Sequence, residues 1–336
     1  MSINLRLNIL SFLLFSFLFN FNTSAQNTIY NAKLTKPTYL KSGDTIAIVA
    51  PAGILKNKEP IEKAIKLVES WGLHVILGKH LFGSNFHFSG TDTERTEDFQ
   101  SALDNKTVKA IWCGRGGYGT VRIIDRLDFT KFKTNPKWII GYSDITVLHS
   151  HLHTLGYETL HAMMPVNMKV KKEDRLKTVK TFKKALFGKK LNYKIASSPY
   201  NKLGTAKGQL VGGNLSILQS LLGSVSSINT KGKILFIEDV GEYLYSIDRM
   251  IYALKRSGYF KNCNGIIVGG MTNIKDNSTP FGQTVEEIVL EATKEFDFPI
   301  LFDFPAGHDK DNRAIFLGRE IEMKIGKKHA IVKFIK

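Results

Sequence analysis

Short apolar runs rich in β-branched residues alternate with stretches of helical periodicity along most of this chain. In the first half the apolar runs lie at 45–50, 74–77, 110–113 and 138–140, and helical patterns lie at about 60–71, from Asp92, after Tyr118 and over 144–155. Strands separated by helices in this way are typical of a parallel sheet with helices on both faces. We therefore predict a doubly wound α/β domain.

Thr91 or Asp92 is placed to cap the helix that starts there, with Glu94 reaching back as in a capping box.

A second alternating pattern occupies the other half, with apolar runs at 234–237 and 265–270 and helical patterns at 214–222, after Ser246 and at 285–296. Between the halves, residues 169–190 hold ten Lys or Arg residues around an apolar stripe of Leu176, Val179, Phe182 and Leu186. This spacing predicts an amphipathic helix with a solvated basic face, and a site for an anionic ligand is the alternative. We expect an N-terminal domain over 40–168, a basic interdomain linker segment over 169–205 and a smaller C-terminal α/β domain over 206–336.

Composition narrows the class of protein. The chain has 336 residues, 43% of them hydrophobic, and a formal net charge of +17. The apolar content is sufficient for a large core and excludes a disordered, collagen-like or polytopic membrane protein. Cys113 and Cys263 leave at most one disulfide and no Cys-based zinc site. The positive charge suits nucleic acid, an anionic envelope surface or an acidic substrate, but no nucleic-acid-binding motif accompanies it, so we expect no nucleic-acid partner.

Residues 1–25 have the pattern of a signal peptide. Arg6 precedes the apolar run 9–21, and small and polar residues end at Ala25. The run is shorter than the roughly 20 residues that span a membrane, so an uncleaved anchor is the weaker alternative. We expect cleavage after Ala25, a mature chain without stable membrane insertion, and export to the periplasm or cell envelope.

The segment 138–145 (WIIGYSDI) is the most distinctive local motif. An apolar strand turns through Gly141 into a helix, which places Ser143 at the carboxyl end of a parallel strand and near a helix amino terminus. Both features suit a nucleophile, because ligands bind at this edge and amide groups there stabilise an oxyanion. The turn resembles a nucleophile elbow, except that Ile145 replaces the second glycine of G-x-S-x-G. The alternative is that Ser143 only caps the helix.

A glycine-rich turn, 114–119, follows the strand that ends at Cys113. Glycines allow positive φ angles and close approach of a ligand to backbone amides, which suits an oxyanion or a carboxylate. The turn lacks the residues of a P-loop and the register of a dinucleotide site. Cys113 is interpreted as a structural residue at the end of its strand.

A serine nucleophile needs a histidine base, and that histidine needs an acceptor for its second nitrogen. His308 lies in a loop of the second half, and Glu238 and Asp239 both stand at the end of the apolar strand 234–237. From the residues alone, either acid is a candidate partner.

The run of His149, His151 and His153 invites a metal interpretation. On a helix, His149 and His153 share a face and His151 points away, so the three cannot converge on one ion. We expect neither a metal nor another cofactor.

These motifs together resemble the LD-carboxypeptidases of serine peptidase family S66, which include muramoyltetrapeptide carboxypeptidases and microcin C immunity peptidases. The resemblance runs from about Gly43 to Leu317 and rests on the segments 46–53, 88–103, 110–125, 138–149, 208–224, 234–250 and 304–312. It implies a flavodoxin-like or amidotransferase-like first domain, a smaller second α/β domain, an active site in the cleft between them and a homodimer.

Matched residue by residue, the resemblance implies that Ser143 is the nucleophile, Glu238 the acid of the triad and His308 the base. It thereby favours Glu238 over Asp239. Departures from the family pattern at 161–165 and 315–318 lie outside these three residues and affect substrate preference more than reaction class.

The resemblance also places the oxyanion hole at the amide of Asp144 and in the 115–119 turn, where we choose Gly117 and its neighbour Gly116. Arg115 is a candidate for binding the terminal carboxylate of the substrate, with a structural ion pair as the alternative.

The implied reaction is hydrolysis, through an acyl-enzyme, of the bond between an L-centre and a terminal D-alanine in a peptidoglycan tetrapeptide. The alternatives are the same mechanism acting on a peptide antibiotic or another acyl-amide, and a non-catalytic peptidoglycan-binding protein that keeps the fold.

Overall fold

Two β-sheets form the framework of residues 34–335, the part of the chain that this computed structural model describes; the predicted signal segment 1–25 lies outside it. The first sheet has the strand order β11-β5-β4-β3-β1-β2. Its strands are β1 (Thr45–Val49), β2 (His74–Leu77), β3 (Val108–Cys113), β4 (Trp138–Gly141), β5 (Thr159–His161) and β11 (Ile315–Leu317). The first five are parallel, whereas β11 pairs with β5 in the antiparallel sense.

Helices cover both faces of this sheet, as its continuous apolar strands require. They are α2 (Glu59–Glu69) and α6 (Leu176–Leu186) on one face, and α3 (Asp92–Asp104), α4 (Thr130–Thr134) and α5 (Thr146–Thr154) on the other. The side chains of successive residues of β1 point to opposite faces of the sheet. Ile48 packs in the core beneath α2, and Val49 packs in the core beneath α3. The predicted doubly wound arrangement is confirmed.

The predicted cap of α3 is also confirmed, because the Glu94 amide donates to Thr91 Oγ1 at 3.2 Å and the Glu94 carboxylate accepts from the Thr91 amide at 2.7 Å. The helix predicted after Tyr118 is instead two single 3₁₀ turns, Thr120–Arg122 and Ile124–Arg126. The seven residues from Thr120 to Arg126 are too few for a stable helix, and the adjacent Ile123 and Ile124 are both buried.

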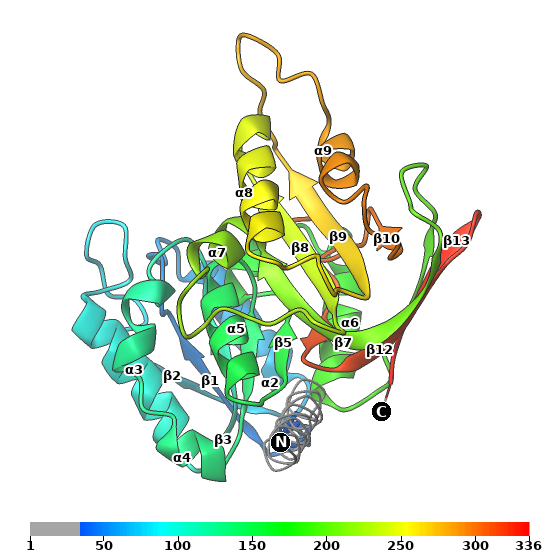
Figure 1. Cartoon of the computed structure of the whole chain (residues 1–336). Coiled ribbons are helices and arrows are strands. Elements are labelled where there is room, and N and C mark those ends of the chain that lie inside the picture. The colour runs from blue at the N-terminus through cyan, green and yellow to red at the C-terminus, as the bar shows by residue number, and fades with distance from the viewer. Residues whose placement is uncertain (1–33, 336) are drawn as a thin grey trace, which may run out of the picture. The chain divides into compact units, whose positions relative to one another are not determined.

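The second sheet has the order β10-β9-β8-β7-β12-β13-β6. Its strands are β6 (Asn192–Ala196), β7 (Gly204–Asn214), β8 (Ile234–Val240), β9 (Gly265–Thr272), β10 (Ile300–Leu301), β12 (Glu320–Ile325) and β13 (His329–Phe334). β7 to β10 are parallel, whereas β6, β12 and β13 are joined in antiparallel pairs. The helices α7 (Leu215–Ser220), α8 (Leu244–Arg256) and α9 (Val285–Ala292) pack with β8 and β9 in one core (Figure 1).

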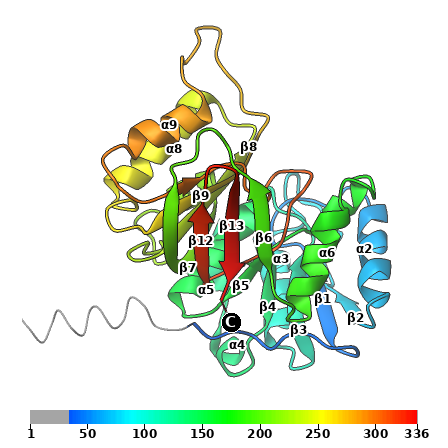
Figure 2. The same cartoon turned by 90° about the vertical axis from the view of Figure 1, so that its right-hand side faces the viewer.

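The segment 169–205, predicted to be a linker, contributes to both halves. Its basic amphipathic helix is α6, which buries Phe182 against Trp112 of the first sheet at a ring distance of 5.1 Å; Leu176, at the start of the predicted apolar stripe, is 56% exposed. The same segment then supplies β6 to the second sheet, beside β13 (Figure 2). Since β11 also returns from the second half to the first sheet, the chain joins the two halves at several points.

Candidate active site

Ser143 stands directly after β4, in the turn that leads into α5. Its φ angle is +65°, in the left-handed region that residues other than glycine rarely adopt, and such strain persists only where the surroundings fix it. The side chain of Ile145, which replaces the second glycine of the elbow motif, lies over Gly141: a Cβ atom on Gly141 would come 2.8 Å from Ile145 Cγ1. The sharp turn therefore depends on Gly141, and it leaves Ser143 half-buried at the carboxyl end of β4.

The glycine-rich turn after β3 packs against Ser143. A Cβ atom on Gly116 would stand 2.8 Å from Ser143 Cβ and 3.3 Å from the amide nitrogen of Asp144, so a side chain at this position would collide with the elbow. The Gly116 carbonyl accepts a hydrogen bond from the Gly53 amide at 3.0 Å, and Gly117 has a φ angle of +104°. The residues predicted for the oxyanion hole thus lie against or next to the elbow.

Glu238 and His308 form a hydrogen-bonded pair at the end of β8. The fully buried Glu238 accepts two hydrogen bonds at Oε2, from His308 Nδ1 at 2.6 Å and from the His308 amide at 3.0 Å. Because a carboxylate only accepts, Nδ1 carries the hydrogen and Nε2 is the nitrogen left to accept a proton. Gly307 permits this contact, since a Cβ atom there would lie 2.6 Å from Glu238 Cγ.

Burial and charge act in opposite directions on His308. Burial of the ring lowers the pKa of His308, but the hydrogen bond from its Nδ1 to Glu238 and the negative charge of that carboxylate raise it, and the net shift is upward. His308 is thus a stronger base than an exposed histidine, and its imidazolium form is stabilised by Glu238.

His308 approaches the elbow through Tyr142, the residue before Ser143. The two rings meet edge to face, with their centroids 4.9 Å apart. Within residues 34–335 no hydrogen bond joins the Ser143 hydroxyl to His308. Such contacts between base and nucleophile are often long in free enzymes and tighten when substrate binds.

Asp239 has a different role from Glu238. Its carboxylate accepts from Asn214 Nδ2 and from the Ser216 amide, both at 2.9 Å, which ties β8 to the start of α7. Burial, together with the neighbouring charge of Glu238, raises the pKa of Asp239 to about 6. The structure therefore separates the two acids that the sequence left open, and Glu238 is the one that pairs with His308.

Arg115 is half-buried beside the glycine-rich turn, and its Nη1 donates to the Ile54 carbonyl at 3.0 Å. This contact holds the side chain near the elbow, and a guanidinium has further donors that a carboxylate could use. Its role in binding the substrate carboxylate stays a prediction.

The histidines of α5 contribute to packing and hydrogen bonding inside the protein. His149 bridges Thr159 Oγ1 at 2.8 Å and the Gly141 carbonyl at 3.0 Å, so it supports the elbow from behind. Burial lowers the pKa of His149 to about 4 and that of His153 to about 3, which keeps both rings neutral. Cys113 and Cys263 are both buried free thiols.

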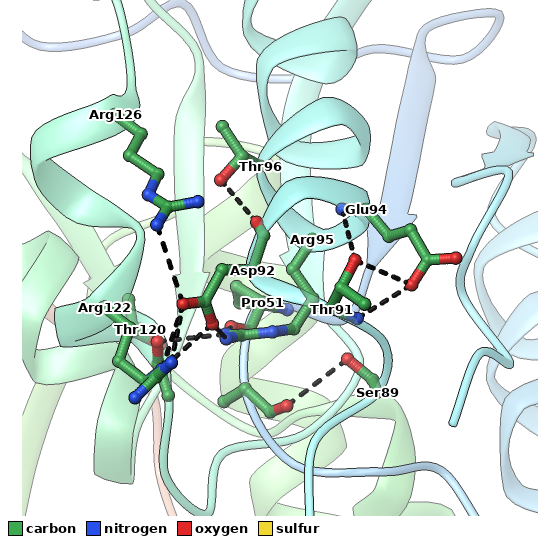
Figure 3. Close-up of polar contacts among 12 residues, drawn as sticks. Pro51, Ser89, Thr91, Asp92, Glu94, Arg95, Thr96, Thr120, Arg122 and Arg126 are labelled. Atoms are coloured by element: carbon green, nitrogen blue, oxygen red, sulfur yellow. Dashed lines mark hydrogen bonds and ion pairs between the residues drawn. The ribbon is translucent and has the colours of Figure 1, made fainter. Parts of the chain in front are cut away.

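Sequence reasoning missed the buried Arg95, which Figure 3 shows in contact with Pro51 and Asp92. Its guanidinium donates to the Pro51 carbonyl and, at 2.9 Å, to the Gly119 carbonyl, and it pairs with Asp92. The residue after Gly119, Thr120, donates its amide to Asp144 Oδ2 at 2.8 Å, which connects this network to the elbow. The one indication of this role in the sequence was that Arg95 follows Asp92, an acid in the first turn of the predicted helix, by three residues.

Replacing Arg95 with methionine is expected to lower the free energy of unfolding by about 3 kcal/mol, because the buried carbonyls of Pro51 and Gly119 lose their donor and Asp92 loses one of its guanidinium partners. Arg126→Met is the matched control: this exposed guanidinium lies 3.8 Å from the same Asp92 carboxylate, and its loss is expected to cost under about 1 kcal/mol. Urea denaturation of both variants measures the difference, and equal losses would contradict a special role for the buried arginine.

Two family models match this chain, and both describe LD-carboxypeptidases of peptidase family S66. The model of the N-terminal domain covers residues 46–162, and that of the C-terminal domain covers residues 207–323. A probable murein peptide carboxypeptidase of Bacillus subtilis (strain 168) is 36% identical over 306 residues, which are 89% of this chain and 94% of the relative. The chain belongs to the LD-carboxypeptidase family, as its motifs predict.

Solved structures have the same fold. A muramoyltetrapeptide carboxypeptidase from Oxalobacter formigenes has a TM-score of 0.78 at 25% identity, covering 87% of this chain and 99% of that one. The microcin C7 self-immunity protein MccF, in an inactive mutant apo state, has a TM-score of 0.81 at 23% identity, covering 91% and 99%. The predicted two-part α/β architecture is confirmed, and the family makes this protein a peptidase of the LD-carboxypeptidase type.

Proposed function

We propose that this LD-carboxypeptidase works by a serine mechanism in which Ser143 is the nucleophile, His308 the general base and Glu238 the residue that orients and stabilises the imidazolium. The observation that carries the proposal is the 2.6 Å contact of His308 Nδ1 with the buried Glu238, beside an elbow whose serine has a φ angle of +65°. Strained serines at the end of a parallel strand and histidines paired with buried acids are the parts that acyl transfer requires.

The reaction proceeds in two halves. His308 Nε2 takes the proton from Ser143 Oγ while that oxygen attacks the scissile carbonyl carbon, and the amides of Gly117 and Asp144 receive the oxyanion. The imidazolium then gives its proton to the leaving amine, the C–N bond breaks, and an ester to Ser143 remains. Water, activated by the same histidine, hydrolyses the ester and restores the hydroxyl.

The proposed substrate is a peptidoglycan tetrapeptide, in which the scissile bond joins an L-centre, of meso-diaminopimelate or lysine, to a terminal D-alanine. The names of the Bacillus subtilis relative and of the Oxalobacter formigenes structure support this choice. Arg115, near the elbow, is proposed to bind the terminal carboxylate.

The test is an assay of the purified protein on N-acetylmuramoyl tetrapeptide. We expect one equivalent of D-alanine to be released, and no release from the same peptide ending in L-alanine, because the leaving residue binds in a chiral site. Chromatography with chiral derivatisation measures both. Release of L-alanine at the same rate would contradict an LD-carboxypeptidase specificity.

The second candidate is the same mechanism acting on a peptide antibiotic of the microcin C type, which the fold likeness to MccF favours. Inactivity on tetrapeptide combined with hydrolysis of such an antibiotic would support it. The third hypothesis is a non-catalytic peptidoglycan-binding protein, and it requires that neither the tetrapeptide nor the antibiotic is cleaved.

We further propose that the protein is exported, with the signal segment 1–25 removed, and acts as a homodimer in the periplasm or at the cell envelope. The apolar run at 9–21 and the family resemblance support these proposals. Within residues 34–335 no helix is both long and apolar enough to cross a membrane. N-terminal sequencing and sedimentation of the protein from its native cells test processing and assembly.

A further inference from the structure

Four aromatic side chains border the glycine-rich turn 114–119, here also called the oxyanion turn. They are Phe86, His87, Phe88 and Tyr118, and together they are called the aromatic rim. The first three lie in a tight turn closed by two hydrogen bonds of 3.0 Å between the backbones of Asn85 and Phe88. This turn touches the glycine-rich loop, because a Cβ atom on Gly117 would stand 3.9 Å from His87 Nε2. The rim therefore begins one residue from the glycine that packs against Ser143.

The base of the rim is held rigidly. The ring of Phe88 meets that of His87 edge to face, with the centroids 5.5 Å apart. It meets the ring of Tyr118 in a tilted arrangement, with the centroids 5.8 Å apart. Behind Phe88 lie two guanidinium groups, Arg95 at 4.9 Å and Arg122 at 5.3 Å from its ring centroid. Aromatic rings fixed in this way lose little conformational entropy when a ligand packs on them.

The outer part of the rim is exposed at a cost in stability. Phe86 is 96% exposed and has a φ angle of +53°, whereas a phenylalanine normally avoids both water and the left-handed region. Tyr118 is 46% exposed. An exposed apolar group held in a strained backbone, next to a catalytic loop, indicates a surface that is covered when a ligand binds.

The reaction limits which part of a substrate can reach the rim. A carboxypeptidase removes one C-terminal residue, so only that residue lies on the leaving side and the rest of the substrate extends from the acyl side. Three extended residues span about 10 Å, which is enough to lead away from Ser143 past the oxyanion turn. Beyond them, in the proposed substrate, lies the muramoyl sugar.

A sugar matches the chemistry of the rim better than the peptide does. The alanine and diaminopimelate or lysine side chains are methyl and charged groups, which need small or ionic sites. A pyranose ring instead presents an apolar C–H face that packs on aromatic rings, and its hydroxyl and acetamido groups can bond to a tyrosine hydroxyl or an imidazole.

We propose that the aromatic rim is a sugar-binding subsite, which holds the N-acetylmuramoyl ring of a muropeptide while its peptide reaches Ser143. This inference rests on the proposed function and adds a substrate determinant to it. The rim makes the protein prefer sugar-bearing tetrapeptides over the free tetrapeptide.

The test compares two substrates that differ only in the sugar, the free tetrapeptide and N-acetylmuramoyl tetrapeptide. For the wild-type protein we expect kcat/KM to be about tenfold higher with the sugar. Phe86→Asn and Tyr118→Ala are each expected to reduce this ratio about three- to tenfold through KM for the sugar-bearing substrate. Asparagine tolerates the left-handed region, so Phe86→Asn removes the ring without adding strain.

Tyr200→Ala is the matched control, since Tyr200 is 40% exposed and lies in the second half of the chain; the ratio should stay as in wild type. An unchanged ratio in the rim variants, or equal losses on both substrates, would overturn the sugar subsite while leaving the proposed function standing. Cleavage of neither substrate by wild type would overturn the proposed function itself. A dimer that dissociates in Phe86→Asn with the sugar preference retained would assign the rim to contact between copies instead.

Discussion

Replacing Ser143 with alanine is expected to reduce D-alanine release at least about 10⁴-fold, because the variant has no oxygen to form the acyl-enzyme. Alanine keeps the Cβ atom and the backbone preferences of serine, so the strained φ angle of +65° is retained at the same cost. The melting temperature should therefore stay within about 2 °C of wild type. Enzyme assay and calorimetry on the same preparation separate loss of chemistry from loss of fold.

Ser101→Ala is a suitable control, since this exposed serine lies on α3 and its replacement should leave turnover unchanged. A fluorophosphonate probe should label wild type and Ser101→Ala at Ser143 but leave Ser143→Ala unlabelled. Turnover retained in Ser143→Ala would refute the nucleophile assignment. A wild-type protein that neither turns over nor reacts with the probe would instead favour the non-catalytic binding protein.

The alternation of apolar runs and helical patterns was sufficient to predict both α/β halves, because a strand buried on two faces leaves a continuous apolar signature. It could not predict that β11 returns to the first sheet or that β6 joins the second. These two strands are only three and five residues long, and their places are set by pairing with residues more than 130 positions away. Such pairings depend on tertiary packing rather than on local sequence.

Parts of the candidate site were also visible in the sequence, since Gly141 and the glycines of 114–119 are needed locally for sharp turns at strand ends. The network of Arg95 was not, because apart from Asp92 its acceptors are the backbone carbonyls of Pro51 and Gly119, and any residue supplies a carbonyl. The strain at Phe86 could not be predicted either, since no residue type next to this phenylalanine in the sequence indicates a positive φ angle.

The choice between Glu238 and Asp239 shows what geometry adds to a motif. Successive side chains of a strand point to opposite faces, so two adjacent acids on β8 cannot both meet His308. Glu238 faces His308, and Asp239 faces Asn214 and the start of α7. The residues alone left this open because both acids end the same apolar run.

Replacing Glu238 with glutamine is therefore expected to lower kcat about 10³- to 10⁴-fold, because the amide carries no charge to stabilise the imidazolium that forms as Ser143 attacks. Asp239→Asn is the matched control one residue away. It removes an acid of similar burial that does not touch His308, so we expect kcat to fall less than tenfold.

The pH profile supplies an independent readout of the same substitution. His308 acts as a base only when neutral, and its pKa is raised, so activity of the wild type should be lost as the pH falls through a value above the ordinary histidine pKa of about 6.5. In Glu238→Gln the hydrogen bond to a carboxylate and the attraction of its charge are gone, whereas burial and the weaker attraction of Asp239 remain, so the pKa of His308 is lowered. The acid limb of kcat/KM should consequently move to lower pH while the plateau falls. A limb that stays in place, or moves to higher pH, would mean that Glu238 does not set the basicity of His308, and the triad would need another acid.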